Sequence, residues 1–188
     1  MRIVGGRLRG RPIASPAHDG LRPTSDRVRE SVFNILAHGL DGFDIEGLRV
    51  IDLFAGTGAL GLEALSRGAA YALFVEEGAE SRALIRRNIE AFGLMGQTRI
   101  FRRDATDMGP LGTMAPFGLA FLDPPYGKGL GEKALIALRD GGWLVPGALV
   151  IAEESAASPI VWPDGYHALD RRTWGDTEVA FARAAEPA

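Results

Sequence analysis

Apolar residues along the chain alternate between short continuous runs and longer stretches with helical spacing. Short runs at 49–54, 71–76, 98–102, 118–122 and 148–153 predict buried strands. The stretches at 60–67, 79–92 and 130–139 place apolar residues three or four positions apart and predict helices. Strands that alternate with helices predict a mainly parallel sheet with helices on both faces.

Both ends of the chain depart from this alternation. Residues 1–23 mix glycine, arginine and proline, and residues 1–8 predict a short strand or hairpin arm. A helix is expected from Thr24 to about Gly39, with Thr24 or Ser25 as its cap and with Arg27, Asn34 and part of the Arg29/Glu30 pair opposite its apolar face. Runs near 166–173 and 177–182 predict a hairpin, which completes a seven-stranded α/β fold.

Composition limits the range of possible functions. The 188 residues are 46% hydrophobic and contain no long polar tract, so we expect one main domain at 24–185 beside a basic N-terminal arm at 1–23. The absence of cysteine excludes disulfides, cysteine-bound metals and a cysteine nucleophile, and no motif calls for a metal. With no signal peptide and no apolar run near the roughly 20 residues that cross a bilayer, we expect a cytoplasmic monomer without membrane contact.

Charge is distributed unevenly. Residues 1–30 contain seven arginines and three acidic residues, a net charge of +4, although the whole chain carries −3. A basic arm on an acidic body suits a polyanion such as RNA, with Arg7, Arg9 and Arg11 as phosphate contacts. The alternative is an arm whose arginines are simply solvated.

The tetrapeptide Asp123-Pro124-Pro125-Tyr126 follows a predicted strand and suits the methylation of a planar amine. An amine conjugated to a ring is a poor nucleophile until its lone pair is localised. The Asp123 carboxylate and the Pro124 carbonyl can accept its two N–H bonds, while Tyr126 stacks on the ring. The prolines stiffen this arrangement. The alternative is a turn that merely ends the strand.

A glycine-rich segment follows the first predicted strand. Residues 52–61, DLFAGTGALG, match the dinucleotide pattern G-x-G-x-x-G, which is weak evidence by itself. Asp52 precedes the first glycine, where a carboxylate would attract the ammonium and sulfonium groups of S-adenosylmethionine rather than a phosphate. The expected contacts in this loop are Asp52, Phe54, Ala55, Gly56, Thr57 and Gly58.

Acidic residues also follow the next strands. Glu76, with Glu77 as an adjacent competitor, can accept the ribose hydroxyls, and Asp104 can accept the adenine amino group beside the backbone of Ala105. Any one of these acids could be a solvated loop residue. Four acids at successive strand ends predict a donor pocket at the carboxyl edge of the sheet.

These motifs together resemble the class I S-adenosylmethionine-dependent methyltransferases, whose Rossmann-like fold the resemblance implies. The segments IVGG at 3–6, LRPTSDRVRE at 21–30 and DLFAGTGALGLEA at 52–64 are similar to the RsmD family, and the resemblance runs from about residue 2 to about residue 181. It implies methylation of guanine N2 in 16S ribosomal RNA of the small subunit or its assembly intermediate. It also implies that Arg22, Thr24 and Arg27 lie near the catalytic mouth.

Three other functions are consistent with part of this pattern. The tetrapeptide alone does not distinguish guanine N2 from adenine N6 or another amine, but a DNA adenine methylase ordinarily needs an added target-recognition domain. An NAD-dependent oxidoreductase would share the glycines and leave Asp123 to Tyr126 without a role. A non-catalytic ribosome-binding protein would not need both motifs.

Overall fold

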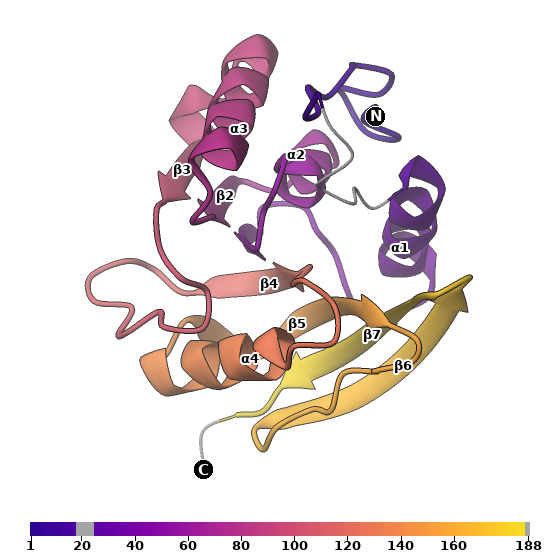
Figure 1. Ribbon diagram of the computed structural model, residues 1–188, viewed down its shortest axis with the longest axis vertical. Helices are drawn as coiled ribbons and strands as arrows, with labels where there is room; N and C mark the ends of the chain where they lie inside the picture. Colours follow the sequence, from indigo (N-terminus) through magenta and orange to yellow (C-terminus); the bar gives the residue numbers. More distant parts are fainter. Residues whose placement is uncertain (18–24, 187–188) are drawn as a thin grey trace.

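The computed structural model describes residues 1–17 and 25–186, and these form a seven-stranded sheet in the order β3-β2-β1-β4-β5-β7-β6. Strands β1 to β5 are parallel, and β7 is antiparallel to both β5 and β6. The order reverses between β1 and β4, the place where open α/β sheets bind ligands. The predicted Rossmann-like sheet with a C-terminal hairpin is therefore confirmed (Figure 1).

The elements follow the predicted boundaries closely, except that β5 is longer than predicted. The strands are β1 Arg49–Leu53, β2 Tyr71–Val75, β3 Thr98–Phe101, β4 Phe117–Leu122, β5 Leu144–Ser155, β6 Tyr166–Trp174 and β7 Thr177–Ala184. The helices are α1 Asp26–His38, α2 Ala59–Ser66, α3 Ala79–Phe92 and α4 Leu130–Gly141, with a short 3-10 helix, η1, at Met95–Gln97. Ser25 caps α1, because its hydroxyl accepts the Val28 amide at 3.2 Å.

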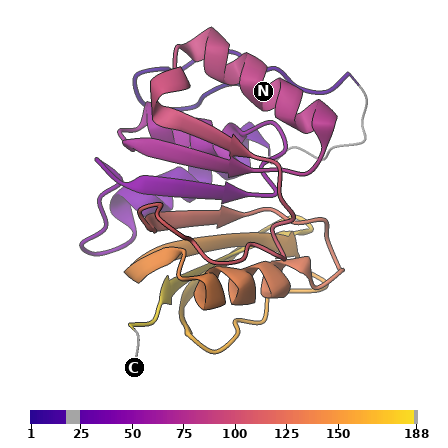
Figure 2. The same ribbon diagram turned by 90° about the vertical axis from the view of Figure 1, so that its left-hand side faces the viewer.

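Two apolar cores lie on the two faces of the sheet. Helices α1, α2 and α3 supply buried residues to one core, and α4 with the 105–114 loop supplies the other. Both views place α3 at one end of the molecule and the C-terminal strands at the other (Figures 1 and 2). Among the described residues, no helix combines the length and apolar character needed to cross a membrane.

The N-terminal segment folds back on itself and packs on the domain. Ile3 accepts the Gly10 amide at 2.8 Å and donates to the Arg11 carbonyl at 3.0 Å. The side chains of Ile3, Leu8 and Ile13 are almost fully buried in the core beside α2. The chain turns back on itself as a hairpin would, but its two sides are joined by an isolated bridge between Arg2 and Pro12 and no strand forms within residues 1–8. Its apolar residues belong to the core on one face of the sheet. The expected boundary at residues 23–24 lies outside the described residues.

Of the pair expected partly on the polar face of α1, Glu30 is exposed and the side chain of Arg29 is fully buried. Its guanidinium contacts the buried Glu63 carboxylate at 3.4 Å and Asp26 at 2.9 Å, and it donates to the Arg2 carbonyl. Glu63 also accepts the backbone amide of Gly5 at 2.8 Å. The carboxylate of Glu63 on α2 thus compensates the charge of buried Arg29. The spacing of residues along α1 could not reveal this partner, because it lies 34 positions away in sequence.

Candidate active site

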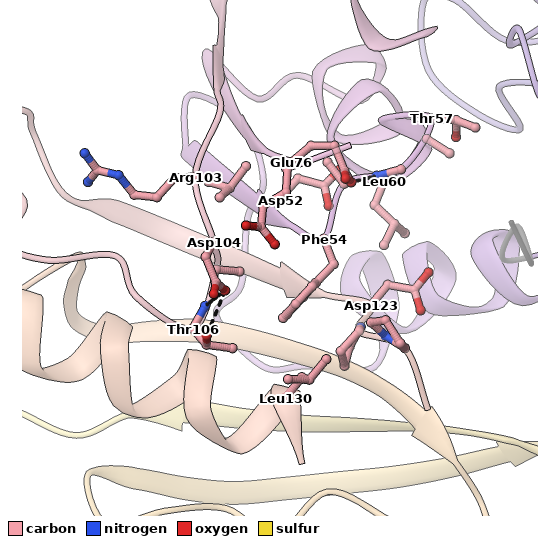
Figure 3. A pocket seen from close by; sticks show the side chains of 18 of the residues that line it. Asp52, Phe54, Thr57, Leu60, Glu76, Arg103, Asp104, Thr106, Asp123 and Leu130 are labelled. Carbon is pink, nitrogen blue, oxygen red and sulfur yellow. Dashed lines mark hydrogen bonds between the residues drawn. The ribbon is translucent and has the colours of Figure 1, made fainter. Parts of the chain in front are cut away.

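A cavity of about 580 Å³ opens at the carboxyl ends of β1, β2 and β4 and beside the loop after β3. This volume lies within the range of small-molecule sites. Figure 3 shows Asp52, Phe54, Asp104 and Asp123 around the same space. All four predicted catalytic residues line it, as do nine of the ten predicted cofactor residues; Gly58 is absent from the lining and forms the helix cap behind it.

The glycine loop joins β1 to α2 through an unusual backbone. Phe54 has φ of 57°, the one positive value at a non-glycine residue among those described. Bulky residues rarely adopt this conformation, which places strain at the wall of the cavity. Gly56 and Gly58 also have positive φ, and Gly58 is the N-cap of α2. Gly61 serves packing instead, since a β-carbon there would lie 2.5 Å from the Phe74 ring.

Asp52 is buried near the end of β1, and its Oδ2 accepts the Gly61 amide at 3.0 Å. Burial raises the pKa of Asp52 to about 8, the hydrogen bond from Gly61 lowers it, and the charge of Glu76 raises it. A cation beside this carboxylate would stabilise its ionised form and offset the unfavourable desolvation. The observation fits the ammonium group of S-adenosylmethionine.

Glu76 and Glu77 both border the cavity, but they differ in their contacts. The Glu76 carboxylate accepts the Gly56 amide at 2.8 Å and the Gly78 amide at 2.9 Å, which joins the β2 end to the glycine loop. Glu77 is exposed, and its backbone carbonyl accepts a hydrogen bond from Arg82. Each Glu76 oxygen has a second acceptor site, so the carboxylate can still take ribose hydroxyls.

The loop after β3 presents Asp104 beside the buried Ala105. Asp104 Oδ1 accepts both the amide and the hydroxyl of Thr106, at 2.8 and 2.7 Å (Figure 3). These bonds form an Asx turn that fixes the carboxylate at the edge of the cavity. Both use Oδ1, which leaves Oδ2 suited to an exocyclic amine.

The Asp123–Tyr126 loop leaves β4 beside the glycine loop, since the Asp123 amide donates to the Leu53 carbonyl at 3.4 Å. Pro124 is buried, Pro125 is exposed and Tyr126 is half-buried. The Tyr126 hydroxyl donates to Glu153 and lies 3.3 Å from the Thr177 hydroxyl. Burial, and then the hydrogen bond to Glu153, raise the pKa of Tyr126, so the phenol remains protonated.

The four predicted substrate residues that the structure describes do not line this cavity. Arg7 contacts Gln97 at 3.3 Å, and Arg11 donates to the Ala91 carbonyl at 2.8 Å. Those partners precede β3 and lie at the end of α3, near the amino ends of the strands. Arg9 and Arg27 are exposed outside the cavity lining. Arg22 and Thr24 lie outside the described residues.

Seven lining residues were not among the predicted site residues, although Ala59 and Leu60 belong to the glycine-rich segment 52–61. They are Met1, Ala59, Leu60, Val75, Arg103, Thr106 and Leu130. The Met1 sulfur accepts the Thr57 hydroxyl at 3.7 Å, so the first residue of the arm reaches the glycine loop. A residue 56 positions away in sequence is brought there by the packing of the arm on α2.

The sheet order, the acid at each strand end and the Asp-Pro-Pro-Tyr loop together define a Rossmann-like methyltransferase. The chain belongs to the family whose model is described as Conserved hypothetical protein 95, which matches residues 1–183. This family includes the RsmD type, so the expected resemblance is confirmed.

Named relatives agree with this assignment. "Ribosomal RNA small subunit methyltransferase D" of Escherichia coli K12 is 43% identical over 155 residues, which cover 81% of this chain and 74% of the relative. The protein of the same name from Haemophilus influenzae is 33% identical and covers 93% of this chain and 89% of its own length. The solved structure of "Putative methyltransferase yhhF from Escherichia coli" superposes with a TM-score of 0.83 at 31% identity, covering 100% of this chain and 99% of that one.

Proposed function

We propose that this protein transfers a methyl group from S-adenosylmethionine to the exocyclic N2 of a guanine in 16S ribosomal RNA of the small subunit or its assembly intermediate. The observation that carries the proposal is one cavity lined by both a buried Asp52 and the Asp123–Tyr126 loop. The names of the relatives specify methylation of small-subunit ribosomal RNA, and the RsmD resemblance specifies guanine N2.

The donor half of the site consists of the strand-end acids. Asp52 would hold the ammonium group, Glu76 the ribose hydroxyls and Asp104 the adenine amine, with the backbone of residues 54–58 close around the ligand. Bound S-adenosylmethionine would supply an electrophilic methyl group. None of these roles uses a metal or a second cofactor.

The acceptor half is the Asp123–Tyr126 loop. Asp123 and the Pro124 carbonyl accept the two N–H bonds of the guanine amine and direct its lone pair outward, while the Tyr126 ring stacks on the base. Bound S-adenosylmethionine would supply its methyl group to this nitrogen and leave as S-adenosylhomocysteine, and the proton that the nitrogen loses would pass to solvent. Positioning and electrostatics supply the acceleration.

RNA would extend well beyond the cavity. The exposed Arg7, Arg9 and Arg11 lie on a different part of the surface, so we assign them to phosphates remote from the modified base. Arg22, Thr24 and Arg27 remain candidates for contacts near the base. The substrate also implies that the enzyme acts in the cytoplasm, and we propose that it acts as a monomer.

Methylation of small-subunit particles from cells lacking this protein tests the proposal. The wild type should transfer one methyl group from labelled S-adenosylmethionine, and mass mapping should locate it on guanine N2. Asp123→Ala should reduce kcat by at least about a hundredfold, because it removes an acceptor used in the transition state. Its affinity for S-adenosylmethionine, measured by calorimetry, should remain.

The matched control is Asp107→Ala, which removes an exposed carboxylate in the loop after β3 and should leave kcat unchanged. Methylation that persists in Asp123→Ala would refute the acceptor assignment. A methyl group on adenine would favour the N6-adenine alternative. NADH binding without binding of S-adenosylmethionine would favour the oxidoreductase.

A further inference from the structure

Two consecutive glutamates at the carboxyl end of β5 contact the loop that carries Tyr126. Glu153 accepts the Tyr126 hydroxyl, with the Thr177 hydroxyl 3.3 Å from the same oxygen. Glu154 accepts the Gly127 amide at 3.0 Å. Glu153 and Glu154 are only 8% and 2% exposed, so they belong to the interior of the protein. Buried carboxylates of this kind persist where hydrogen bonds compensate their desolvation.

The two carboxylates reach the loop from opposite faces of the sheet. Successive side chains of a strand alternate between faces. In β5, Ile151 belongs to the core under α1, α2 and α3, and Ala152 belongs to the core beside α4. Glu153 continues the first face and Glu154 the second. Tyr126 and Gly127, which are consecutive in the loop, are therefore held from both sides of β5.

Building on the proposed function, we infer that Glu153 is a positioning residue that fixes the Tyr126 ring for the acceptor base. Thr177 and Glu154 also hold the loop, and we call the three residues together the clamp. Glu153 does not touch the reacting atoms in this role. It acts through Tyr126, whose hydroxyl it holds while the ring remains at the cavity wall. The C-terminal hairpin thereby takes part in acceptor binding through Thr177, the first residue of β7.

The physical advantage is preorganisation. A tyrosine anchored only at its backbone changes rotamer freely, and each substrate encounter would have to order the ring again. A hydroxyl bound to a buried carboxylate removes that cost before RNA arrives. Because burial keeps the phenol protonated, the hydroxyl remains a donor to Glu153. The clamp should therefore affect the RNA substrate and leave the donor half of the site unchanged.

Steady-state methylation of small-subunit particles by full-length Glu153→Ala and Glu153→Gln tests this inference. Glu153→Ala should lower kcat/KM for RNA by about tenfold to a hundredfold, the range of a lost hydrogen bond to a charged group. Glu153→Gln should restore most of it, because its amide oxygen still accepts the hydroxyl. Calorimetry should show the same affinity for S-adenosylmethionine in all three proteins.

A double-mutant cycle separates this effect from general damage. If Glu153 acts through the hydroxyl, Tyr126→Phe combined with Glu153→Ala should lose no more activity than the more damaging single change. Glu178→Ala is the matched control, because Glu178 pairs with Glu154 in the β5–β7 register but binds Arg171 on the hairpin. It should retain wild-type kinetics.

Three outcomes would overturn the inference. They are wild-type kcat/KM in Glu153→Ala, failure of Glu153→Gln to restore activity, and a parallel loss of affinity for S-adenosylmethionine, which would indicate a purely structural role. The wild-type reaction distinguishes a failure of this inference from a failure of the proposed function. If the wild type methylates no small-subunit RNA, the proposed function itself is wrong and the inference falls with it.

Discussion

Asp52 occupies an environment that disfavours its charge. It is 1% exposed, with Glu76 as a nearby like charge, and its pKa in the folded protein is about 8 against 3.8 as the ordinary value. The folded state therefore binds this proton more tightly than the unfolded chain does. Ionisation of Asp52 should reduce the stability of the ligand-free protein as the pH rises from about 4 to 8.

A cationic ligand reverses this preference, and a pH profile tests the effect. Binding of the ammonium group should favour ionised Asp52, so affinity for S-adenosylmethionine should rise between pH 6 and pH 8, by at most about tenfold per pH unit. Asp52→Asn should bind more weakly, and its profile should be flat. Calorimetric titrations of both proteins across this range provide the measurement, and parallel profiles would contradict the role of Asp52.

At the scale of elements, α2 joins the arm to the domain through Glu63. Its carboxylate is fully buried and accepts the Val4 amide at 3.0 Å and the Gly5 amide at 2.8 Å. It also pairs with Arg67 at 2.9 Å and with the buried Arg29. A single side chain thus bonds the arm, α1 and the end of α2 together.

Glu63→Ala should lower the free energy of unfolding by about 3–5 kcal/mol, because it leaves buried Arg29 without this counter-charge and the arm without two acceptors. Urea unfolding followed by circular dichroism measures the change. Glu90→Ala removes an exposed carboxylate from α3 and should shift stability by less than about 0.5 kcal/mol. Equal midpoints for the two variants would show that the Glu63 cluster contributes little.

The boundaries of helices and strands were predicted best where residues at the boundary itself, such as capping glycines, define them. Helix α3 has its predicted limits because Gly78 precedes it and Gly93 ends it in a left-handed conformation. Strand β5 is twelve residues long, twice its predicted length, and it includes Pro146 and Gly147. An irregularity in the β4–β5 register near Phe117 accommodates that segment, and this depends on the neighbouring strand.

At the scale of the whole molecule, Arg7, Arg9 and Arg11 of the arm lie outside the cavity lining, although Met1 at the start of the arm reaches it. Replacement of Arg7, Arg9 and Arg11 by alanine should weaken RNA binding and lower its salt slope by about one for each lost phosphate contact. The value of kcat should remain, because these side chains lie near the amino ends of the strands. Filter binding across salt concentrations and single-turnover methylation provide the measurements.

Arg172→Ala on β6 is the control for loss of one exposed positive charge, since it lies on the edge strand farthest from β3. It should change neither the affinity nor the slope. If the arm variant behaves like this control, its arginines are solvated and do not contact RNA.

The sequence by itself determined the order of strands and helices along the chain, the glycine loop and the acids at four strand ends. These features depend on neighbouring residues, and parallel strands bring their carboxyl ends to one edge without further information. Only the tertiary structure placed Met1 against Thr57, buried Arg29 on Glu63 and anchored Tyr126 to Glu153 and Thr177. Each of these contacts joins residues far apart in the chain, so its formation depends on how the packed elements meet rather than on any local pattern.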